Sequence, residues 1–192
     1  MKQTLKSLAC VGLVISLAGC SSILSATRDD PIVDDRGTRT TGSAIDDSLI
    51  STKVDVNVDK AHPDLASQSR VLNVTYNGVV LLIGQVPRAE LKDLAARAAQ
   101  NVQRVKRVQN EITIGQPIGF AARSNDSLLT TKIKTQMLAD SNIPGRRITV
   151  TTENGVVYLM GLLTRQEADL ATGLVQGISG VQRIVRVFEY IN

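Results

Sequence analysis

A single eight-residue pattern occurs twice in this chain of 192 residues and constrains its fold more than any other feature. The first copy is NGVVLLIG at residues 77–84, and the second is NGVVYLMG at residues 154–161. Asn-Gly is the preferred pair in the two-residue type I′ turn of a β-hairpin, because both positions need a positive φ. Each turn is followed by a β-branched run that a glycine closes. The pattern therefore predicts two hairpins, whose first strands are residues 71–75 and 148–152.

The duplication extends beyond the hairpins. Residues 47–54 (DSLISTKV) match residues 126–133 (DSLLTTKI), and residues 105–108 (VKRV) match residues 181–184 (VQRI). Three matches in the same order indicate two copies of one domain of about 70 residues, a size at which the core is marginal. Each copy is expected to have the order α-β-β-α-β, an α+β fold with a small sheet packed on two helices. We place the copies at residues 46–115 and 124–192, with a linker at residues 116–123.

In the first repeat, Asp46 or Asp47 is expected to cap a helix with apolar residues at positions 50, 54 and 58 on one face. The alternating segment VDVNV at residues 54–58 could also form a strand, but the alignment to the second repeat favours a helix. Pro87 is expected at the first position of a helix over residues 88–102. A final strand is expected over residues 105–114.

In the second repeat, one of the cap-forming residues 124–126 is expected to begin a helix with a buried stripe at positions 129, 133 and 137. A second helix over residues 165–178 is expected to begin with a capping box formed by Thr164 and Glu167 and to stop at Gly180. The last strand is expected over residues 181–191. Because the linker is short, the repeats should touch, with Ile118 and Phe120 as candidate contacts.

The amino-terminal segment has the parts of an export signal. Lys2 and Lys6 precede an apolar run, and residues 1–19 are too short to serve comfortably as a permanent membrane span. The last residues, LAGC at 17–20, resemble the lipobox of bacterial lipoproteins, although an ordinary signal peptide containing a cysteine is the alternative. The resemblance implies cleavage before Cys20, a thioether-linked diacylglycerol on its sulfur and an acylated (palmitate-type) amino terminus. Residues 20–45 are then a lipidated, flexible tether.

Two further features of this segment concern location and redox state. Cys10 lies in the signal, so lipidation of Cys20 leaves no thiol for a disulfide in the mature chain. Ser21 follows the anchor cysteine, where an aspartate would favour retention in the inner membrane of enteric-type bacteria. By that resemblance, we expect the protein at the periplasmic face of the outer membrane.

The first helix of the second repeat carries large apolar residues on its nominal solvent face. At about 100° per residue, Leu128 and Leu138 each fall about 140° from the centre of the buried stripe. Apolar groups beside lysines are typical of a helix that lies on an anionic membrane surface. Alternatively, exposed leucines are ordinary, or Leu128 packs on the first repeat. The predicted lipid-binding residues are Leu128, Thr131, Lys132, Lys134, Thr135 and Leu138.

The sequence contains no recognisable catalytic constellation. His62 is the only histidine, so a histidine-based triad or a metal site with several histidines is not available. We expect no enzymatic activity, no metal and no cofactor. The formal net charge of +4 becomes 4 − 2 = +2 once Lys2 and Lys6 are removed with the signal, too small a bias to indicate nucleic acid.

The α-β-β-α-β repeat with its NGxVxLxG hairpin resembles the BON domain. Two such domains behind a lipobox resemble the DolP family of dual BON-domain outer-membrane lipoproteins, on the segments GQPIG (115–119), SND (124–126), TTK (130–132), VTTENG (150–155) and LMGL (159–162). That resemblance implies a non-enzymatic protein that binds anionic phospholipid through the first helix of its second domain. It also implies a role in envelope integrity and in cell-division-linked remodelling.

The sequence departs from the family pattern at Leu128, where the family has tryptophan. Leucine can insert but lacks the interfacial preference of tryptophan, so weaker binding is expected. The expected ligands are phosphatidylglycerol and cardiolipin. The alternative is a periplasmic protein-interaction scaffold, in which the same helix binds outer-membrane assembly, division or cell-wall proteins.

Overall fold

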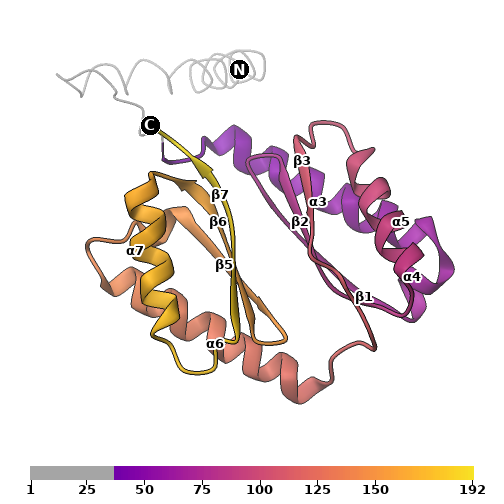
Figure 1. The fold of residues 1–192 in the computed structure, drawn as a ribbon. Helices are drawn as coiled ribbons and strands as arrows, with labels where there is room; N and C mark the ends of the chain where they lie inside the picture. Colours follow the sequence, from indigo (N-terminus) through magenta and orange to yellow (C-terminus); the bar gives the residue numbers. More distant parts are fainter. Residues whose placement is uncertain (1–36) are drawn as a thin grey trace, which may run out of the picture. The chain divides into compact units, whose positions relative to one another are not determined.

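The computed structural model describes residues 37–192, which lie in one compact unit. The predicted signal, Cys20 and most of the predicted tether lie outside the described residues. Figure 1 shows the two repeats in chain order. The elements of the first repeat are α3 (Thr41–Ala61), α4 (Pro63–Ser67), β1 (Arg70–Tyr76), β2 (Val79–Val86), α5 (Ala89–Gln100), β3 (Arg107–Asn110) and β4 (Thr113–Ile114). Those of the second are α6 (Phe120–Ala139), the 3₁₀ turn η1 (Gly145–Arg147), β5 (Ile148–Glu153), β6 (Val156–Leu163), α7 (Arg165–Gln176) and β7 (Arg183–Tyr190).

Each repeat folds its strands into one small mixed sheet. β1 pairs with β2 antiparallel, and β3 and β4 both pair with β2 in parallel. The second repeat has the same arrangement, with β5 antiparallel and β7 parallel to the central strand β6. A parallel pair needs a crossover connection, which α5 and α7 provide. The predicted α+β fold with the order α-β-β-α-β is confirmed.

Both hairpins turn at the predicted Asn-Gly pairs. Asn77 and Gly78 have φ values of 50° and 78°, and Asn154 and Gly155 have φ values of 51° and 72°, as a type I′ turn requires. The glycines that were expected to close the second strands lie inside them instead. Gly84 pairs with Val71 across the first hairpin, and β2 continues to Val86.

The predicted helix caps at 46–47 and 124–126 are wrong, because both helices begin earlier. Thr40 is the N-cap of α3 and accepts the Ser43 N–H at 3.1 Å, while Gly119 precedes the first residue of α6. Asp47 and Asp126 are therefore buried inside helices, where their carboxylates bind the hairpin turns. Residues 41–45 and 120–123, assigned to the tether and the linker, are helical.

Three smaller expectations also change. Pro87 precedes Arg88, the extended N-cap of α5, so it is not the first residue of that helix. The strand expected over 105–114 is split into β3 and β4, because Ile112 turns into the core and its N–H binds the Asn110 side chain. The helix expected to run to 178 ends at Gln176. The capping box of Thr164 and Glu167 is present as predicted.

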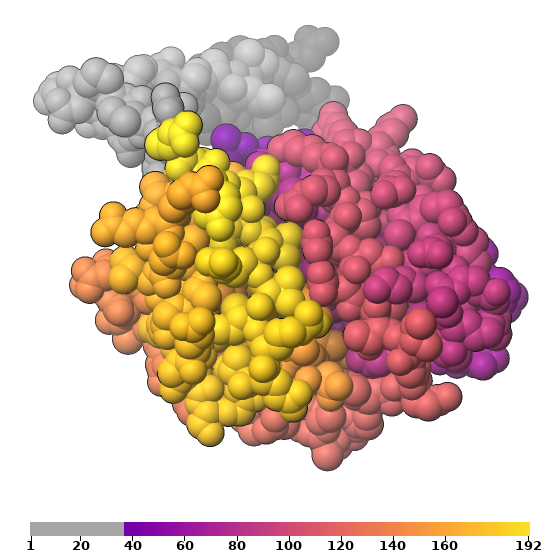
Figure 2. Space-filling model, viewed as in Figure 1, coloured from indigo at the N-terminus to yellow at the C-terminus, as the bar shows by residue number. Residues whose placement is uncertain are grey.

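Each sheet uses both of its faces. One face packs on the helices of its own repeat, against the predicted stripes at 50, 54 and 58 in α3 and at 129, 133 and 137 in α6. The opposite faces pack on each other and bury a third cluster. Its members are Tyr76, Val79, Leu81, Ile83, Tyr158, Met160 and Val187. The two repeats accordingly meet as closely packed surfaces in Figure 2.

Candidate functional site

The outer face of α6 carries the predicted site residues, and the structure leaves all of them in solvent. Leu128 is 71% exposed and Leu138 is 60% exposed. Leu128 therefore does not pack on the first repeat, which was one of the alternatives. Thr131, Lys132, Lys134 and Thr135 are also exposed.

Phe120 is a member of this face that the sequence analysis assigned elsewhere. It was expected to lie in the contact between the two repeats, but its side chain is 83% exposed. It lies 18 residues before Leu138, which is five turns at 3.6 residues per turn, so both occupy the same angular position on α6. The signal was present in the spacing, but it could be read only with a helix that begins at Phe120.

Ile118, the other candidate contact, does bind the first repeat and so fastens the linker to the first sheet. Its N–H donates to the side-chain oxygen of buried Gln85 at 3.1 Å. The contact is made by the main-chain N–H of Ile118.

The charge on the outer face of α6 has one sign. The helix contains Arg123, Lys132 and Lys134, all exposed, and Asp126 is its only acidic residue. Asp126 is buried and accepts the N–H groups of Asn154 and Gly155 at 2.7 and 2.9 Å. The solvent face of α6 therefore presents cations without a competing carboxylate.

The hydroxyl groups between the apolar residues are already hydrogen-bonded. Ser127 donates to the carbonyl oxygen of Arg123 at 3.0 Å, Thr131 to that of Ser127 at 2.9 Å, and Thr135 to that of Thr131 at 2.9 Å. Bonds of this i to i−4 type occupy the donors within the helix. The face can therefore lose water at a lower cost than free hydroxyls would impose.

The core beneath α6 holds this face in place. Leu129, Ile133 and Met137 pack on the second sheet, and Asp126, about two turns into the helix, binds the β5–β6 turn. Thr130 adds a hydrogen bond of 2.8 Å between its hydroxyl and that of Thr152 on β5. The exposed side chains are thus presented from a fixed helix.

The interface between the repeats contains a buried polar cluster. Glu153, almost fully buried, accepts from the Arg70 guanidinium at 3.1 Å and from the Gln85 amide at 3.0 Å. The Asn77 amide donates to Glu189 at 2.9 Å. These directional contacts supplement the apolar cluster and define how the two sheets are aligned.

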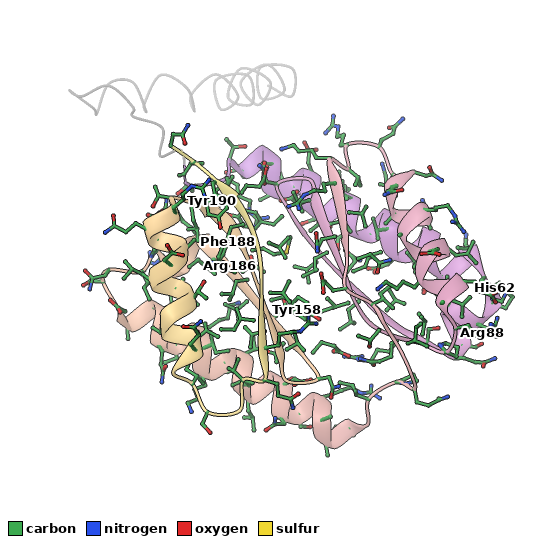
Figure 3. The ribbon with its side chains drawn as sticks, in the orientation of Figure 1. His62, Arg88, Tyr158, Arg186, Phe188 and Tyr190 are labelled. Carbon is green, nitrogen blue, oxygen red and sulfur yellow. The ribbon has the colours of Figure 1, made fainter. Side chains whose placement is uncertain are left out.

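His62 has a structural environment. Its Nδ1 accepts the N–H of Asp64 at 3.1 Å and caps α4, near the Arg88 side chain that pairs with Asp64 at 2.7 Å (Figure 3). Residues 37–192 contain no group of three or more side chains suited to hold a metal ion. Within the same residues, no helix is both long and apolar enough to cross a membrane.

Comparison with known proteins identifies both repeats. The BON domain model matches residues 46–116 and 125–192. The outer membrane lipoprotein DolP of Haemophilus influenzae is 38% identical over 181 residues, which cover 94% of this chain and 90% of the relative. The chain belongs to the DolP family of dual BON-domain outer-membrane lipoproteins.

Other relatives match most of the chain at lower identity. The 21 kDa hemolysin of Actinobacillus pleuropneumoniae is 36% identical over 153 residues, covering 80% of this chain and 78% of that protein. The osmotically-inducible protein Y of Escherichia coli is 29% identical over 149 residues, covering 74% and 72%. In this DolP-family chain, the α6 face belongs to the second BON domain.

Proposed function

We propose that this lipoprotein binds anionic phospholipid through the outer face of α6 and has no enzymatic role. The observation that carries the proposal is the combination on one helix face of three exposed apolar side chains with three exposed cations. Leu128, Leu138 and Phe120 supply apolar area that can enter the boundary between headgroups and acyl chains. Lysines at 132 and 134 supply charge for the phosphates of phosphatidylglycerol or cardiolipin.

The acyl anchor expected on Cys20 and the α6 face have different tasks in this proposal. The anchor confines the protein to one membrane, and α6 sets the orientation of the folded unit on an anionic surface. Leucine at position 128 contributes apolar area without the interfacial preference of tryptophan, so we expect reversible binding that is sensitive to salt.

Liposome binding tests the proposal. The soluble chain from Ser21, without its acyl group, should bind vesicles that contain phosphatidylglycerol and not purely zwitterionic vesicles. Leu128→Asp should weaken binding about tenfold or more, because inserting a leucine side chain is worth about 1.5–3 kcal/mol and 1.4 kcal/mol corresponds to a factor of ten. Binding to neither vesicle would overturn the proposal.

Leu170→Asp is the matched control for this experiment. Leu170 is 43% exposed on α7, a different helix of the same domain, and lies outside the proposed lipid-binding face. The variant should bind anionic vesicles like wild type. An equal loss in both variants would mean that the effect of an added aspartate is not specific to α6.

Salt separates the proposal from the alternative of a protein-interaction scaffold that uses the same helix. Binding through Lys132 and Lys134 should weaken as ionic strength rises and should require negative lipid. An apolar protein contact should survive high salt and require no lipid. A salt-resistant complex with an envelope protein, lost in Leu128→Asp, would favour the scaffold.

We extend the proposal to envelope integrity and to remodelling at division. A strain whose only copy carries Leu128→Asp should resemble a deletion strain in detergent sensitivity and in placement of the protein at the division site. A wild-type phenotype, with the variant protein present at normal amounts, would separate the cellular role from lipid binding.

A further inference from the structure

The helix α3 has a second apolar stripe that the lipid proposal does not use. Ile45, Leu49 and Val56 are all exposed, and with Thr52 they fall within about 60° of one another at about 100° per residue. The stripe lies opposite the buried face of the helix. Thr52 donates its hydroxyl to the carbonyl oxygen of Ser48 at 3.0 Å, so its donor does not require water. Among the described residues, nothing covers this stripe.

The charges beside the stripe are unlike those on α6. The exposed carboxylates of Asp55 and Asp59 are matched in number by the exposed ammonium groups of Lys53 and Lys60, and Asp46 pairs with Arg104. With its charges balanced, this surface lacks the excess of cations that attracts an anionic membrane. The stripe therefore suits a protein partner with both signs of charge.

The second repeat shows that the stripe is particular to α3. Ile45 and Val56 align with Ser124 and Thr135 on α6, so the equivalent face of α6 has hydroxyls where α3 has aliphatic groups. The two copies of this helix thus differ. α6 has separate leucines beside cations, whereas α3 has a continuous stripe beside charges of both signs.

We propose that the α3 stripe binds the α3 stripe of a second copy of this chain in an antiparallel pair. An antiparallel crossing centred between Ile50 and Ser51 places Ile45 against Val56 of the other copy and Leu49 against Thr52. Positions on the same flank meet in such a pair, as e meets e and g meets g in antiparallel coiled coils. Asp46, which pairs with Arg104 in its own chain, then meets Lys53 of the other copy. On either flank, no two like charges of the α3 helices face each other.

The stripe is complementary to itself, because in the antiparallel pair its residues meet each other and Asp46 meets Lys53 on the flank. We therefore infer that the partner is a second copy and not an unrelated helix. A contact made by one face of one helix is small compared with a stable interface of about 1,200–2,000 Å². The pair is therefore weak in free solution. Confinement of anchored copies to one membrane raises their effective concentration and makes the contact populated.

Cysteine cross-linking of the full-length, lipid-anchored chain in vesicles tests this proposal. Cys10 and Cys20 are its only natural cysteines, so Thr52→Cys adds a thiol near the expected two-fold axis. A short bismaleimide should convert this variant to dimer, and adding Leu49→Asp should abolish the dimer. Thr131→Cys on α6 and Ser67→Cys on α4, both exposed, should remain monomeric. Equal cross-linking of all three positions, or of none, overturns the proposal.

A mixed experiment tests the direction of the pair. Copies carrying Ile45→Cys and copies carrying Val56→Cys, with different affinity tags, should cross-link to each other. Neither should cross-link to itself, because the like positions are about 16 Å apart along the axis at 1.5 Å per residue. Self-cross-linking of Ile45→Cys would indicate a parallel contact and overturn the antiparallel proposal.

Discussion

At positions 47 and 126, a buried aspartate makes the same pair of hydrogen bonds in each repeat. The Asp47 carboxylate accepts the N–H groups of Asn77 and Gly78 at 2.7 and 2.8 Å, and Asp126 accepts the equivalent pair in the second hairpin. Both central N–H groups of a type I′ turn thus find a charged acceptor. Burial is tolerated because each carboxylate is hydrogen-bonded by the groups that it orients.

Replacing Asp126 by asparagine should destabilise the protein. The amide retains one acceptor oxygen and turns a donor toward a second N–H, so one buried group loses its partner at a cost of about 1–3 kcal/mol. Urea unfolding measures the change. Asp47→Asn should have a similar effect, whereas Asp169→Asn, which removes an exposed pair with Arg186, should have little. A stability equal to wild type for Asp126→Asn would contradict the role given to this carboxylate.

Among the elements, the hairpins depend on a glycine within their second strands. Gly84 has a φ of 117° and lies opposite Val71, where the strands approach so closely that a Cβ would overlap the carbonyl oxygen of Arg70. At Gly161 in the second hairpin, a Cβ would lie 2.7 Å from the carbonyl oxygen of Arg147. The close approach involves backbone on both sides, so a flexible side chain cannot relieve it.

Gly84→Ala should therefore cost more stability than Gly161→Ala. The first substitution adds a positive-φ penalty of about 1–2 kcal/mol to an overlap of about 1–3 kcal/mol, and the second has mainly the overlap. Gly173→Ala is the control, because it lies in α7 with open space around it and should stabilise by about 0.5–1 kcal/mol. Thermal unfolding compares the three. A Gly84→Ala variant as stable as Gly173→Ala would refute the argument.

At the scale of the whole molecule, equivalent positions of the two repeats meet across the interface. The Tyr76 hydroxyl donates to the carbonyl oxygen of Arg147 at 3.2 Å, and the Arg70 side chain donates to Glu153. The offsets 147 − 70 = 77 and 153 − 76 = 77 equal the offset of the two hairpin motifs, 154 − 77 = 77. The start of β1 thus meets the end of β5, and the end of β1 meets the start of β5. This gives the interface an approximate two-fold symmetry.

The same interface should make stability depend on pH in the alkaline range. Burial between the sheets raises the pKa of Tyr158 to about 12, against 10.0 in an unfolded chain (Figure 3). As pH rises above the unfolded value, the unfolded chain releases this proton and the folded chain retains it, so the free energy of unfolding falls until the folded pKa is passed. Below the unfolded value the contribution is fully present.

Tyr158→Phe should reduce that alkaline loss. Urea unfolding of wild type and variant on both sides of the unfolded phenol pKa of 10.0 measures it. As pH rises, the free energy of unfolding should fall less for the variant than for wild type. Buried Tyr76, whose pKa is also raised by burial, remains in both proteins and contributes equally. Parallel pH profiles would mean that Tyr158 does not couple ionisation to folding.

The local pattern predicted a large part of this architecture. The Asn-Gly turns, the order of helices and strands along the chain, the capping box at Thr164 and the buried stripes of both long helices follow from backbone preference and periodicity, which act over a few residues. The exposed positions of Leu128 and Leu138 follow from the same periodicity. These features depend on neighbours along the chain.

Several features depended instead on residues distant in sequence. Asp47 and Asp126 have the composition of helix caps, and only their contacts with turns about 30 residues away place them inside longer helices. Phe120 reads as a linker residue until α6 is extended. The burial of both faces of each sheet requires the second repeat to be in place.

The sequence alone thus determined two α-β-β-α-β repeats and an amphipathic helix with leucines on its outer face, because hydrophobic period and turn chemistry are local. Tertiary structure decided where the helices start and which sheet faces meet. It also decided that α3 and α6 keep exposed apolar residues, which have different charges around them. The physical reason is that burial is a property of the assembled surfaces. An apolar side chain is hidden or presented according to what packs against it, and the pairing of Tyr76, Leu81, Tyr158 and Met160 between the sheets leaves the helices outside.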